Sequence, residues 1–372
     1  MFLSEKQNCG GSQQWQTNDI TGEKLEIMSA NASYYYHQLN KEQQKAYYAM
    51  KSGLQSLAAS FPVPRLSAKE LVDIYFMVRL DCPEIFYSVK FSYKYYPDSE
   101  YVELKPEYLF PKNKIKEHQQ AMQARIRKLI RPAEKLDEKG KEQYIHDFIC
   151  QNITYDKLKK AYSHEIIGAL GHGVGVCEGI AKTVKILCDN LGIWCVIALS
   201  EANPEKGIKY RHAWNVLRIG GEYYHLDATF DNTLSHEDVI RYDYYNLSDT
   251  QIFRDHEPVI WKIPVCKDGS HTYYREKKIS FTKQEDVRKR AAQAAKKGKI
   301  LLFHWRGGYL TREVLGELLQ ILEEEAAKKQ KHAYLSLNWP QAVLQVAFKE
   351  EASSQQIVME DANEGEKYDV KE

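Results

Sequence analysis

Apolar residues recur at helical spacing near the start of the patterned part of the chain. Residues 41–60 carry such a stripe, and a capping box formed by Ser67 and Glu70 begins a second helix. From Tyr87 to Tyr95 the period changes to two, because apolar and aromatic residues alternate with Ser and Lys as they do along a strand. A turn and a second strand follow. Residues 33–131 are therefore predicted to form a region of mixed helices and strands.

The centre of the chain begins after a boundary at Pro132. A charged amphipathic helix is predicted over residues 112–130, and the proline and the charged residues after it separate this helix from the next. That next helix carries its apolar stripe over residues 138–151. Between Ile180 and Leu191 apolar residues recur again at helical steps, which predicts another buried helix. These helices and the strands after them are assigned to a central domain over residues 138–265.

The last part of the pattern predicts a small α/β region over residues 280–350. The segment KILLFHW is typical of a buried strand, a leucine-rich helix follows it, and AYLSLN and AVLQVAF predict two more strands. The two ends of the chain lack any such period. Residues 1–32 are polar and residues 351–372 are acidic, so both are predicted to be disordered.

Composition narrows the class of protein. The chain has 52 basic and 51 acidic residues and a net charge of +1, so no overall field draws it to nucleic acid or to an anionic membrane. Neither a signal sequence nor an apolar run of about 18 residues is found. The seven cysteines are widely spaced and odd in number, which favours free thiols. We expect a cytoplasmic protein with no cofactor, no nucleic-acid partner and no membrane partner.

Cys177 stands apart from the other cysteines because of its position. A glycine-rich segment, residues 171–175, is predicted to be a permissive loop, and the helix through Ile180 ends at Gly192, so Cys177 lies where the loop enters the helix. The free N–H groups and the dipole of a helix start stabilise a thiolate, the nucleophilic form of cysteine. Glu178 opposes this effect with its negative charge, so Cys177 needs a base partner.

Packing is the ordinary role of a free cysteine, and we assign that role to the others. None of them combines a helix start with a glycine-rich approach. They are Cys9, Cys82, Cys150, Cys188, Cys195 and Cys266.

A predicted hairpin supplies the base partner. Two strand-like runs flank Gly220–Gly221, and a two-residue turn there pairs Trp214 with Asp227 and His212 with Thr229. His212 and Asp227 then become diagonal neighbours on one face, with Cα atoms about 7 to 8 Å apart, which a hydrogen bond between the side chains can bridge. A three-residue loop would break this register.

The hairpin pattern also separates the two faces of the sheet. The face opposite His212 carries apolar residues that suit a hydrophobic core: Ala213, Leu217, Ile219, Tyr224, Leu226 and Ala228. A histidine held by a carboxylate and pointing away from that core can act as general base toward a thiol and as general acid toward a leaving group. His225 falls on the His212 face and is interpreted as a support residue.

Three sequence blocks together resemble the transglutaminase-like superfamily in its bacterial form. They are Gly175-Val-Cys177-Glu-Gly179, His212-Ala-Trp-Asn215 and His225-Leu-Asp227-Ala-Thr-Phe-Asp231, and the resemblance spans roughly residues 138 to 250. The segments YYYHQLNKEQQKAYYAM and LDCPEIFYSV also look like the companion region that precedes this domain in some bacterial members.

The resemblance implies an α+β fold related to papain, in which a helix that carries the nucleophile packs on an antiparallel sheet. It implies Cys177 as nucleophile, His212 as base and Asp227 as orienting acid. The family takes its second oxyanion donor from a position upstream of the cysteine, and no residue here matches it. The Cys177 backbone N–H is the donor that can be named.

Several functions stay open at this point. Acyl transfer through a thioester on a peptide or glutamine-type amide is the leading hypothesis, with water or an amine as acceptor. A non-catalytic scaffold is the alternative, in which tyrosines of the N-terminal region bind a partner: Tyr34, Tyr35, Tyr36, Tyr93, Tyr95 and Tyr96. Zinc binding by Cys177, His212, His225 and Asp227 is a third reading without a close-spaced ligand pair. Asp231 and Asp243 lack the spacing of a calcium loop. The oligomeric state is undetermined.

Overall fold

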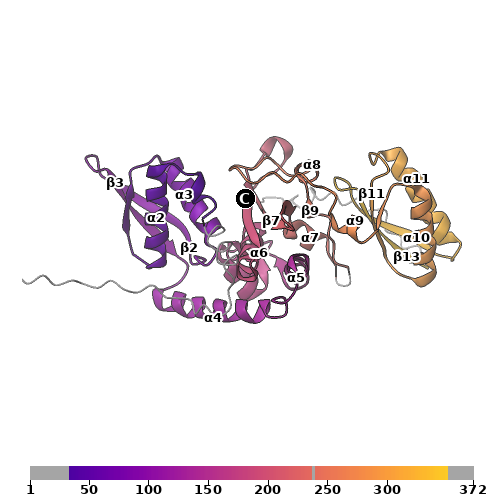
Figure 1. Ribbon diagram of the computed structural model, residues 1–372, viewed down its shortest axis with the longest axis horizontal. Coiled ribbons are helices and arrows are strands. Elements are labelled where there is room, and N and C mark those ends of the chain that lie inside the picture. The colour runs from indigo at the N-terminus through magenta and orange to yellow at the C-terminus, as the bar shows by residue number, and fades with distance from the viewer. Residues whose placement is uncertain (1–32, 237–238, 351–372) are drawn as a thin grey trace, which may run out of the picture.

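A computed structural model describes residues 33–236 and 239–350 of the chain. In it three units follow one another along the long axis of the molecule, and the central unit contains the predicted nucleophile helix (Figure 1). The predicted arm at 1–32 and the predicted tail at 351–372 lie outside the described residues. Among the helices of the described ranges, none has both the length and the apolar character needed to cross a membrane.

The N-terminal unit combines two helices with a small sheet. The capping box predicted at Ser67 and Glu70 is present, and a helix begins directly after it. The antiparallel sheet has the order β1-β3-β2. The elements are α2 (Lys41–Gln55), β1 (Phe61–Pro64), α3 (Ala68–Asp81), β2 (Ser88–Tyr95) and β3 (Tyr101–Tyr108), after a short 3-10 turn, η1 (Tyr36–Gln38). The helices and strands predicted here are therefore confirmed.

A long helix, α4 (Lys112–Ile130), leads from this unit into the central one and runs beneath both in Figure 1. Its buried residues are Ile115, Met122, Ile126 and Ile130. They belong to the same hydrophobic cluster as the buried residues of α2 and α3 and those of the helix and sheet of the central unit. One continuous core thus joins the first two units.

The central unit is built from helices packed on a four-stranded antiparallel sheet of order β6-β7-β8-β9. Its main elements are α5 (Glu138–Asn152), α6 (Cys177–Leu191), β6 (Trp194–Ser200), β7 (His212–Ile219), β8 (Glu222–Leu226), α7 (Ala228–Leu234) and β9 (Tyr245–Leu247). The predicted α+β class is confirmed, with the helix that starts at Cys177 lying against β6 and β7. Its shorter pieces are β4 (Thr154–Tyr155), η2 (Ala161–His164), β5 (Val174–Gly175), η4 (Pro204–Lys206), α8 (Asp249–Ile252) and α9 (Tyr273–Glu276).

Both faces of this sheet are buried. Ala213, Leu217 and Leu226 face the large core beneath α6, as predicted. Trp214 and Val216 face the other way, into a second apolar cluster built with residues that follow β8. The His212 face therefore points away from the first core, as predicted, but the chain after β8 returns to cover it with a second apolar cluster. His212 is left partly exposed at the end of its strand.

The hairpin has the predicted two-residue turn. Gly220 and Gly221 both have positive φ angles, +61° and +89°, a backbone conformation that glycine adopts without a steric penalty. Ile219 therefore pairs with Glu222, and the predicted register holds as far as the pair Asn215 and Leu226.

The predicted register does not extend beyond Leu226. The pairing of Trp214 with Asp227 and of His212 with Thr229 is wrong, because β8 ends and α7 begins at Ala228. His212 is instead paired with Ser200 on β6.

The glycine-rich approach to Cys177 is more ordered than predicted. A turn of π-helix, η3 (Ile167–His172), takes up its first part, and Val174 and Gly175 form a short parallel pair with β4. Only Gly173 in this stretch has a positive φ angle, at +68°. The chain therefore reaches Cys177 along a fixed path.

The C-terminal unit has its own hydrophobic core. Its elements are β10 (Ser280–Phe281), α10 (Gln284–Lys297), β11 (Leu301–Trp305), α11 (Arg312–Ala327), β12 (His332–Asn338) and β13 (Val343–Lys349), in a sheet of order β10-β11-β13-β12. The predicted three strands and one helix are present. Helix α10 was not predicted, because its buried face consists of Val287 and three alanines, which give a weak apolar pattern.

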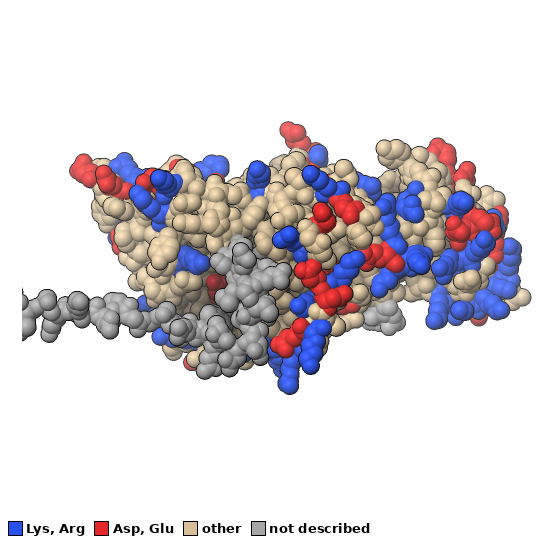
Figure 2. Space-filling view, in the orientation of Figure 1, with Lys and Arg blue, Asp and Glu red and all other residues tan. Residues whose placement is uncertain are grey.

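The charged surface follows these units unevenly. Figure 2 shows Lys and Arg gathered at the end of the molecule where the C-terminal unit lies, with acidic side chains among them.

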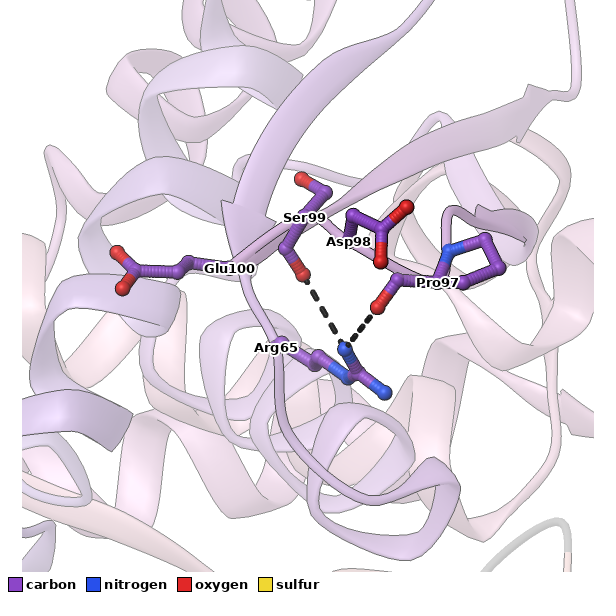
Figure 3. Close-up of a pocket in the computed structure, with 5 residues that line it drawn as sticks. All are labelled: Arg65, Pro97, Asp98, Ser99 and Glu100. Carbon is purple, nitrogen blue, oxygen red and sulfur yellow. Dashed lines mark hydrogen bonds between the residues drawn. The ribbon is translucent and has the colours of Figure 1, made fainter.

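A shallow surface pocket in the N-terminal unit is lined by Arg65, Pro97, Asp98, Ser99 and Glu100 (Figure 3). The Arg65 guanidinium there donates to the carbonyl oxygens of Pro97, at 2.9 Å, and Ser99, at 3.4 Å. The arginine is thus committed to holding the β2–β3 turn.

Candidate active site

Cys177 is the first residue of α6, directly after Val176. Its thiol lies 4.0 Å from the backbone carbonyl oxygen of Arg211, the residue before His212. The first-turn N–H groups of a helix have no partner within the helix, and they point toward the side where Cys177 lies. Of the other cysteines in the described ranges, Cys82, Cys188, Cys195 and Cys266 are buried and Cys150 is partly buried. Cys9 lies outside those ranges.

The structure brings His212 and Asp227 into direct contact. The Nε2 atom of His212 lies 2.5 Å from Oδ2 of Asp227. Asp227 is buried and precedes α7, where its other oxygen, Oδ1, accepts hydrogen bonds from the backbone N–H groups of Thr229, at 2.8 Å, and Phe230, at 3.1 Å. The contact between these two side chains was predicted correctly, but the strand pairing used to predict it was wrong. The carboxylate is positioned because Asp227 caps helix α7.

The electrostatics of this pair favour an imidazolium ion. Burial lowers the pKa of His212, but the charge and hydrogen bond of Asp227 and a hydrogen bond with the Cys177 thiol outweigh it and raise this pKa to about 10. The pKa of Asp227 is correspondingly low: burial would raise it, and the contacts with His212 and His256 reverse that effect. Because Asp227 occupies Nε2, the other ring nitrogen of His212 is the one available to the thiol.

Glu178 does not leave an uncompensated charge beside Cys177. Its Oε1 atom lies 2.7 Å from Nζ of Lys182 and 3.2 Å from the guanidinium of Arg79. Both cations also contact Glu165, so two acids and two bases form one buried network. Arg79 comes from α3, so the N-terminal unit supplies part of the charge that offsets Glu178. The sequence could not predict this contact, because 99 residues separate Arg79 from Glu178.

His256 is the site residue that the sequence missed. Its Nε2 atom lies 2.9 Å from Oδ2 of Asp227, the same oxygen that His212 contacts. Its Nδ1 atom lies 2.8 Å from Oδ1 of Asp255. The adjacent acid and histidine at 255 and 256 were the available signal, and without the fold nothing linked them to Asp227.

His225 links Trp214 to Asp249, which agrees with its interpretation as a support residue. Trp214 donates its indole N–H to Nδ1 of His225 at 2.9 Å, and Nε2 lies 2.8 Å from Oδ1 of Asp249. Burial lowers the pKa of His225, so the ring is neutral and its one proton lies on Nε2. These contacts hold the indole of Trp214, whose ring stacks on His212 with centroids 5.8 Å apart.

Two groups of residues in the described ranges have the composition of metal ligands: His212 with Asp227 and His256, and His225 with Asp249 and Cys266. In the first, both histidines already donate to the carboxylate. In the second, a metal ion on Nε2 of His225 would have to displace the proton that Asp249 accepts, while Nδ1 accepts from Trp214. Neither group fits a metal ion without rearrangement. The structure does not gather the zinc set considered from the sequence, because His225 contacts Asp249 rather than Asp227.

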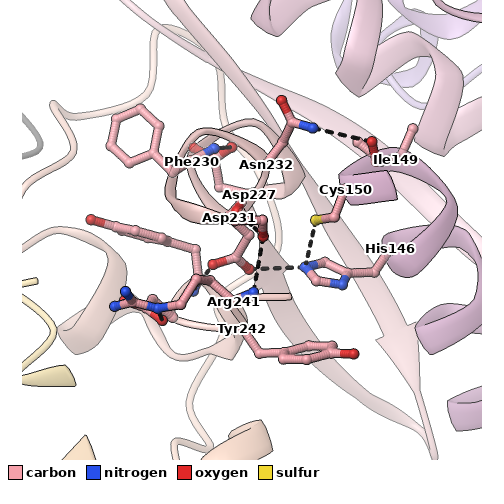
Figure 4. Close-up of polar contacts among 12 residues, drawn as sticks. His146, Ile149, Cys150, Asp227, Phe230, Asp231, Asn232, Arg241 and Tyr242 are labelled. Atoms are coloured by element: carbon pink, nitrogen blue, oxygen red, sulfur yellow. Dashed lines mark hydrogen bonds and ion pairs between the residues drawn. The ribbon is translucent and has the colours of Figure 1, made fainter. Parts of the chain in front are cut away.

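A second set of Cys, His and Asp lies between α5 and α7 (Figure 4). The Nε2 atom of His146 lies 3.0 Å from Oδ2 of Asp231 and 3.7 Å from Sγ of Cys150. Its Nδ1 atom lies 3.2 Å from Oδ1 of Asp147. Burial lowers the pKa of His146, but the Cys150 thiol and the two carboxylates together raise it well above its ordinary value. The ring is buried and both of its nitrogens are engaged.

Comparison with known families identifies the class of the central unit. Residues 126–228 match the model of the transglutaminase-like superfamily. This part of the chain is therefore a transglutaminase-like domain, as the sequence blocks predicted. The match contains Cys177, His212 and Asp227, and it begins within α4, before the start predicted at residue 138.

Solved structures give weaker likenesses. One is a crystal structure of a TGase, with 14% sequence identity and a TM-score of 0.26, in which the match covers 42% of this chain and 48% of that one. Another is a proposed cysteine protease from Cytophaga hutchinsonii, with 16% identity and a TM-score of 0.24, covering 38% of this chain and 62% of that one. The chain thus spans about half to three fifths of these proteins. No curated protein matched the chain.

Proposed function

We propose that the protein is a cysteine-nucleophile enzyme that cleaves or transfers acyl groups of peptide or glutamine-type amides. The observation that carries this proposal is the contact of 2.5 Å between His212 and the buried Asp227, with the Cys177 thiol at a helix start beside the same histidine. A cationic imidazole beside a thiol supports the thiolate, which is the nucleophile. The family match supports the class of reaction and leaves its substrate open.

In the proposed first step, the Cys177 thiolate attacks the carbonyl carbon of the amide and forms a C–S bond. The carbonyl oxygen becomes an oxyanion, for which the backbone N–H of Cys177 is the donor we assign. The intermediate then collapses, the C–N bond breaks, and the His212 imidazolium gives its proton to the departing amine. The products are a thioester on Cys177 and a free amine or ammonia.

In the second step, an acceptor attacks the thioester. Neutral His212 takes a proton from water or from an amine, a new C–O or C–N bond forms, and the C–S bond breaks to return the thiolate. We propose water as the acceptor, so that the protein acts as a cysteine peptidase or amide hydrolase on a protein or peptide. Transfer to an amine differs only in the acceptor and is separated from hydrolysis by the test below.

The test is capture of the thioester. Full-length protein would be incubated with a mixture of glutamine-containing peptides, quenched in acid, and digested, and the Cys177 peptide examined by mass spectrometry for an added acyl group. Hydroxylamine added before the quench should release a hydroxamate. The Cys177→Ala variant is the control. Peptide cleavage, ammonia release and incorporation of a labelled amine then distinguish peptidase, deamidase and acyltransferase. An absence of acyl adduct and of all three products would reject the proposal.

A non-catalytic scaffold is the second candidate, and exposed tyrosines favour it. Tyr93, Tyr95, Tyr96 and Tyr101 are all more than two fifths exposed, on β2, β3 and the turn between them. Tyr35 is not part of such a surface, because it is buried and donates its hydroxyl to the carbonyl oxygen of Ile197 on β6. A protein partner that binds the catalytically inert Cys177→Ala variant as well as the wild type would support the scaffold reading.

A further inference from the structure

His256 occupies a central place beside the proposed catalytic pair. Its side chain is buried and lies between two carboxylates, with Nε2 at 2.9 Å from Asp227 and Nδ1 at 2.8 Å from Asp255. Both contacts use carboxylate oxygens, which only accept hydrogen bonds. The ring therefore donates on both sides and joins the two acids into one chain.

The contact between His256 and Asp227 matters because the buried carboxylate of Asp227 has several partners. Oδ1 accepts from the first turn of α7, and Oδ2 is shared by His212 and His256. Because two backbone N–H groups anchor Oδ1, the rotation left to the carboxylate without His256 is a swing of Oδ2, which would carry the His212 ring with it. A fixed donor on the far side of Oδ2 restricts that rotation.

The C-terminal unit helps to hold the other end of this chain. Asp255 accepts a hydrogen bond of 2.6 Å from the hydroxyl of Tyr244 and longer contacts of 3.4 Å from the side-chain amide of Gln341. Gln341 lies in the turn between β12 and β13, and the same amide donates to the backbone carbonyl of Gln251 at 3.2 Å. The tip of the C-terminal sheet is thus linked to Asp227 by three successive hydrogen bonds, through Asp255 and His256.

We propose that His256 is a positioning residue, which holds the Asp227 carboxylate in the orientation that aligns His212 with Cys177. This inference rests on the proposed function, because it assigns His256 a role in the reactivity of Cys177. His256 acts through Asp227 and need not contact the substrate.

Charge alone would give His256 the opposite effect. A cation close to His212 disfavours a second proton there, and the two rings lie 5.3 Å apart between centroids. The other titratable groups around His256 are the carboxylates of Asp227 and Asp255, with His225 and the Tyr244 hydroxyl further out. Loss of the cation should therefore favour the Cys177–His212 ion pair, whereas loss of the hydrogen bond should misalign it. The sign of the effect distinguishes charge from positioning.

Two amide substitutions separate the two contacts of the ring. In His256→Gln the side-chain amide reaches the place of Nε2 and can still donate to Asp227. In His256→Asn the amide reaches only the place of Nδ1, beside Asp255. Both variants remove the same charge. The rate of iodoacetamide labelling of Cys177, followed by peptide mapping from pH 5 to 9, should stay within about threefold of wild type in His256→Gln and fall about tenfold or more in His256→Asn.

The controls separate this inference from the proposed function. His332→Asn alters an exposed histidine paired with Glu323 and should leave the labelling unchanged. If His212→Ala labels at Cys177 as fast as wild type, the proposed function fails. If His212→Ala is slow but the two His256 variants behave alike, whether fast or slow, the positioning role is overturned. Should His256→Asn not fold, His256→Leu removes both contacts within the same aromatic surroundings, and its labelling must fall likewise; an unchanged rate overturns the inference.

Discussion

The central unit contains two sets of Cys, His and Asp that differ in how the thiol meets the ring. In the first set Asp227 contacts one nitrogen of His212 and leaves the other open, and the thiol of Cys177 lies at the start of a helix, 4.0 Å from the carbonyl oxygen of the residue before His212. In the second set Asp231 and Cys150 both face the same nitrogen of His146, and Asp147 takes the other. The same three residue types therefore make two different sites.

This difference indicates that the way the acid and the thiol share the two ring nitrogens matters more than which residue types are present. A base serves a nucleophile when the acid fixes one ring nitrogen and leaves the other to the thiol. The His146 ring has no nitrogen to spare, and Cys150 lies one helical turn further along α5 rather than at a helix start. The set around His146 joins α5 to α7, whereas the set around His212 has the arrangement that the proposed reaction needs.

The largest expected difference is in the nucleophile. Cys177→Ser should lower the rate of amide cleavage or transfer by at least about 10³-fold, because the hydroxyl is a far weaker nucleophile than a thiolate in this setting. Cys150→Ser should leave the rate unchanged. In the wild type, limited iodoacetamide treatment should mark Cys177 before any other cysteine. Faster labelling of Cys150, mapped by mass spectrometry, would contradict the comparison.

The two aspartates should separate function from stability. Asp227→Asn keeps the shape of the helix cap but changes the proton on His212, so labelling of Cys177 at neutral pH should fall about tenfold or more while the fold persists. Asp231→Asn should instead lower the free energy of unfolding by about 2 kcal/mol, because the buried His146 loses its carboxyl hydrogen-bond partner. Urea denaturation and labelling of both variants check this. An equal loss of Cys177 labelling in Asp227→Asn and Asp231→Asn would contradict this separation of function from stability.

The pH dependence of the free energy of unfolding tests the ion pair between His212 and Asp227 in the first set. The pKa of His212 is raised from its unfolded value near 6.5 to about 10 in the folded protein. Its protonation therefore stabilises the fold fully below pH 6.5, and this contribution is lost as the pH rises to about 10. Between these values the wild type should lose about 5 kcal/mol of unfolding free energy through His212, and Asp227→Asn should lose clearly less. Denaturation at several pH values measures the difference, and parallel curves would argue against the ion pair.

The smallest expected effect concerns the charge next to Cys177. Glu178→Gln removes a negative charge, yet Lys182 and Arg79 already offset it, so the labelling rate of Cys177 should change by no more than about threefold. The same variant should lose stability, since it leaves two buried cations with one acid. A large rise in labelling would mean that the buried network does not compensate Glu178.

Local features of the sequence determined much of this structure. The capping box at Ser67, the two glycines of the hairpin and the helix stripe that starts after Cys177 each act over a few residues. Backbone conformations and side-chain periods of this kind are set by neighbours in the chain. These local features therefore predicted the order of α5, α6, β6, β7 and β8 and the position of Cys177 at the start of α6.

The sequence could not extend the hairpin register to Asp227. The strand pattern of the sequence continues through Ala228 and Thr229. In the structure the carboxylate of Asp227 caps a helix there, and the strand ends. The buried face of α10 was missed for a related reason, since alanines carry little apolar signal of their own. In both cases packing against distant elements decided between local options of similar strength.

By itself, the sequence predicted which residues carry the proposed chemistry: Cys177, His212 and Asp227 are named by their types, by their order and by the resemblance of the three sequence blocks. The tertiary structure alone decided what surrounds them. It brought His256 to Asp227 and Arg79 to Glu178, and it set Cys150 and His146 against Asp231. The physical reason is that a hydrogen bond or an ion pair depends on distances of a few ångströms. Between residues far apart in the chain, only the packing of whole helices and sheets fixes such distances.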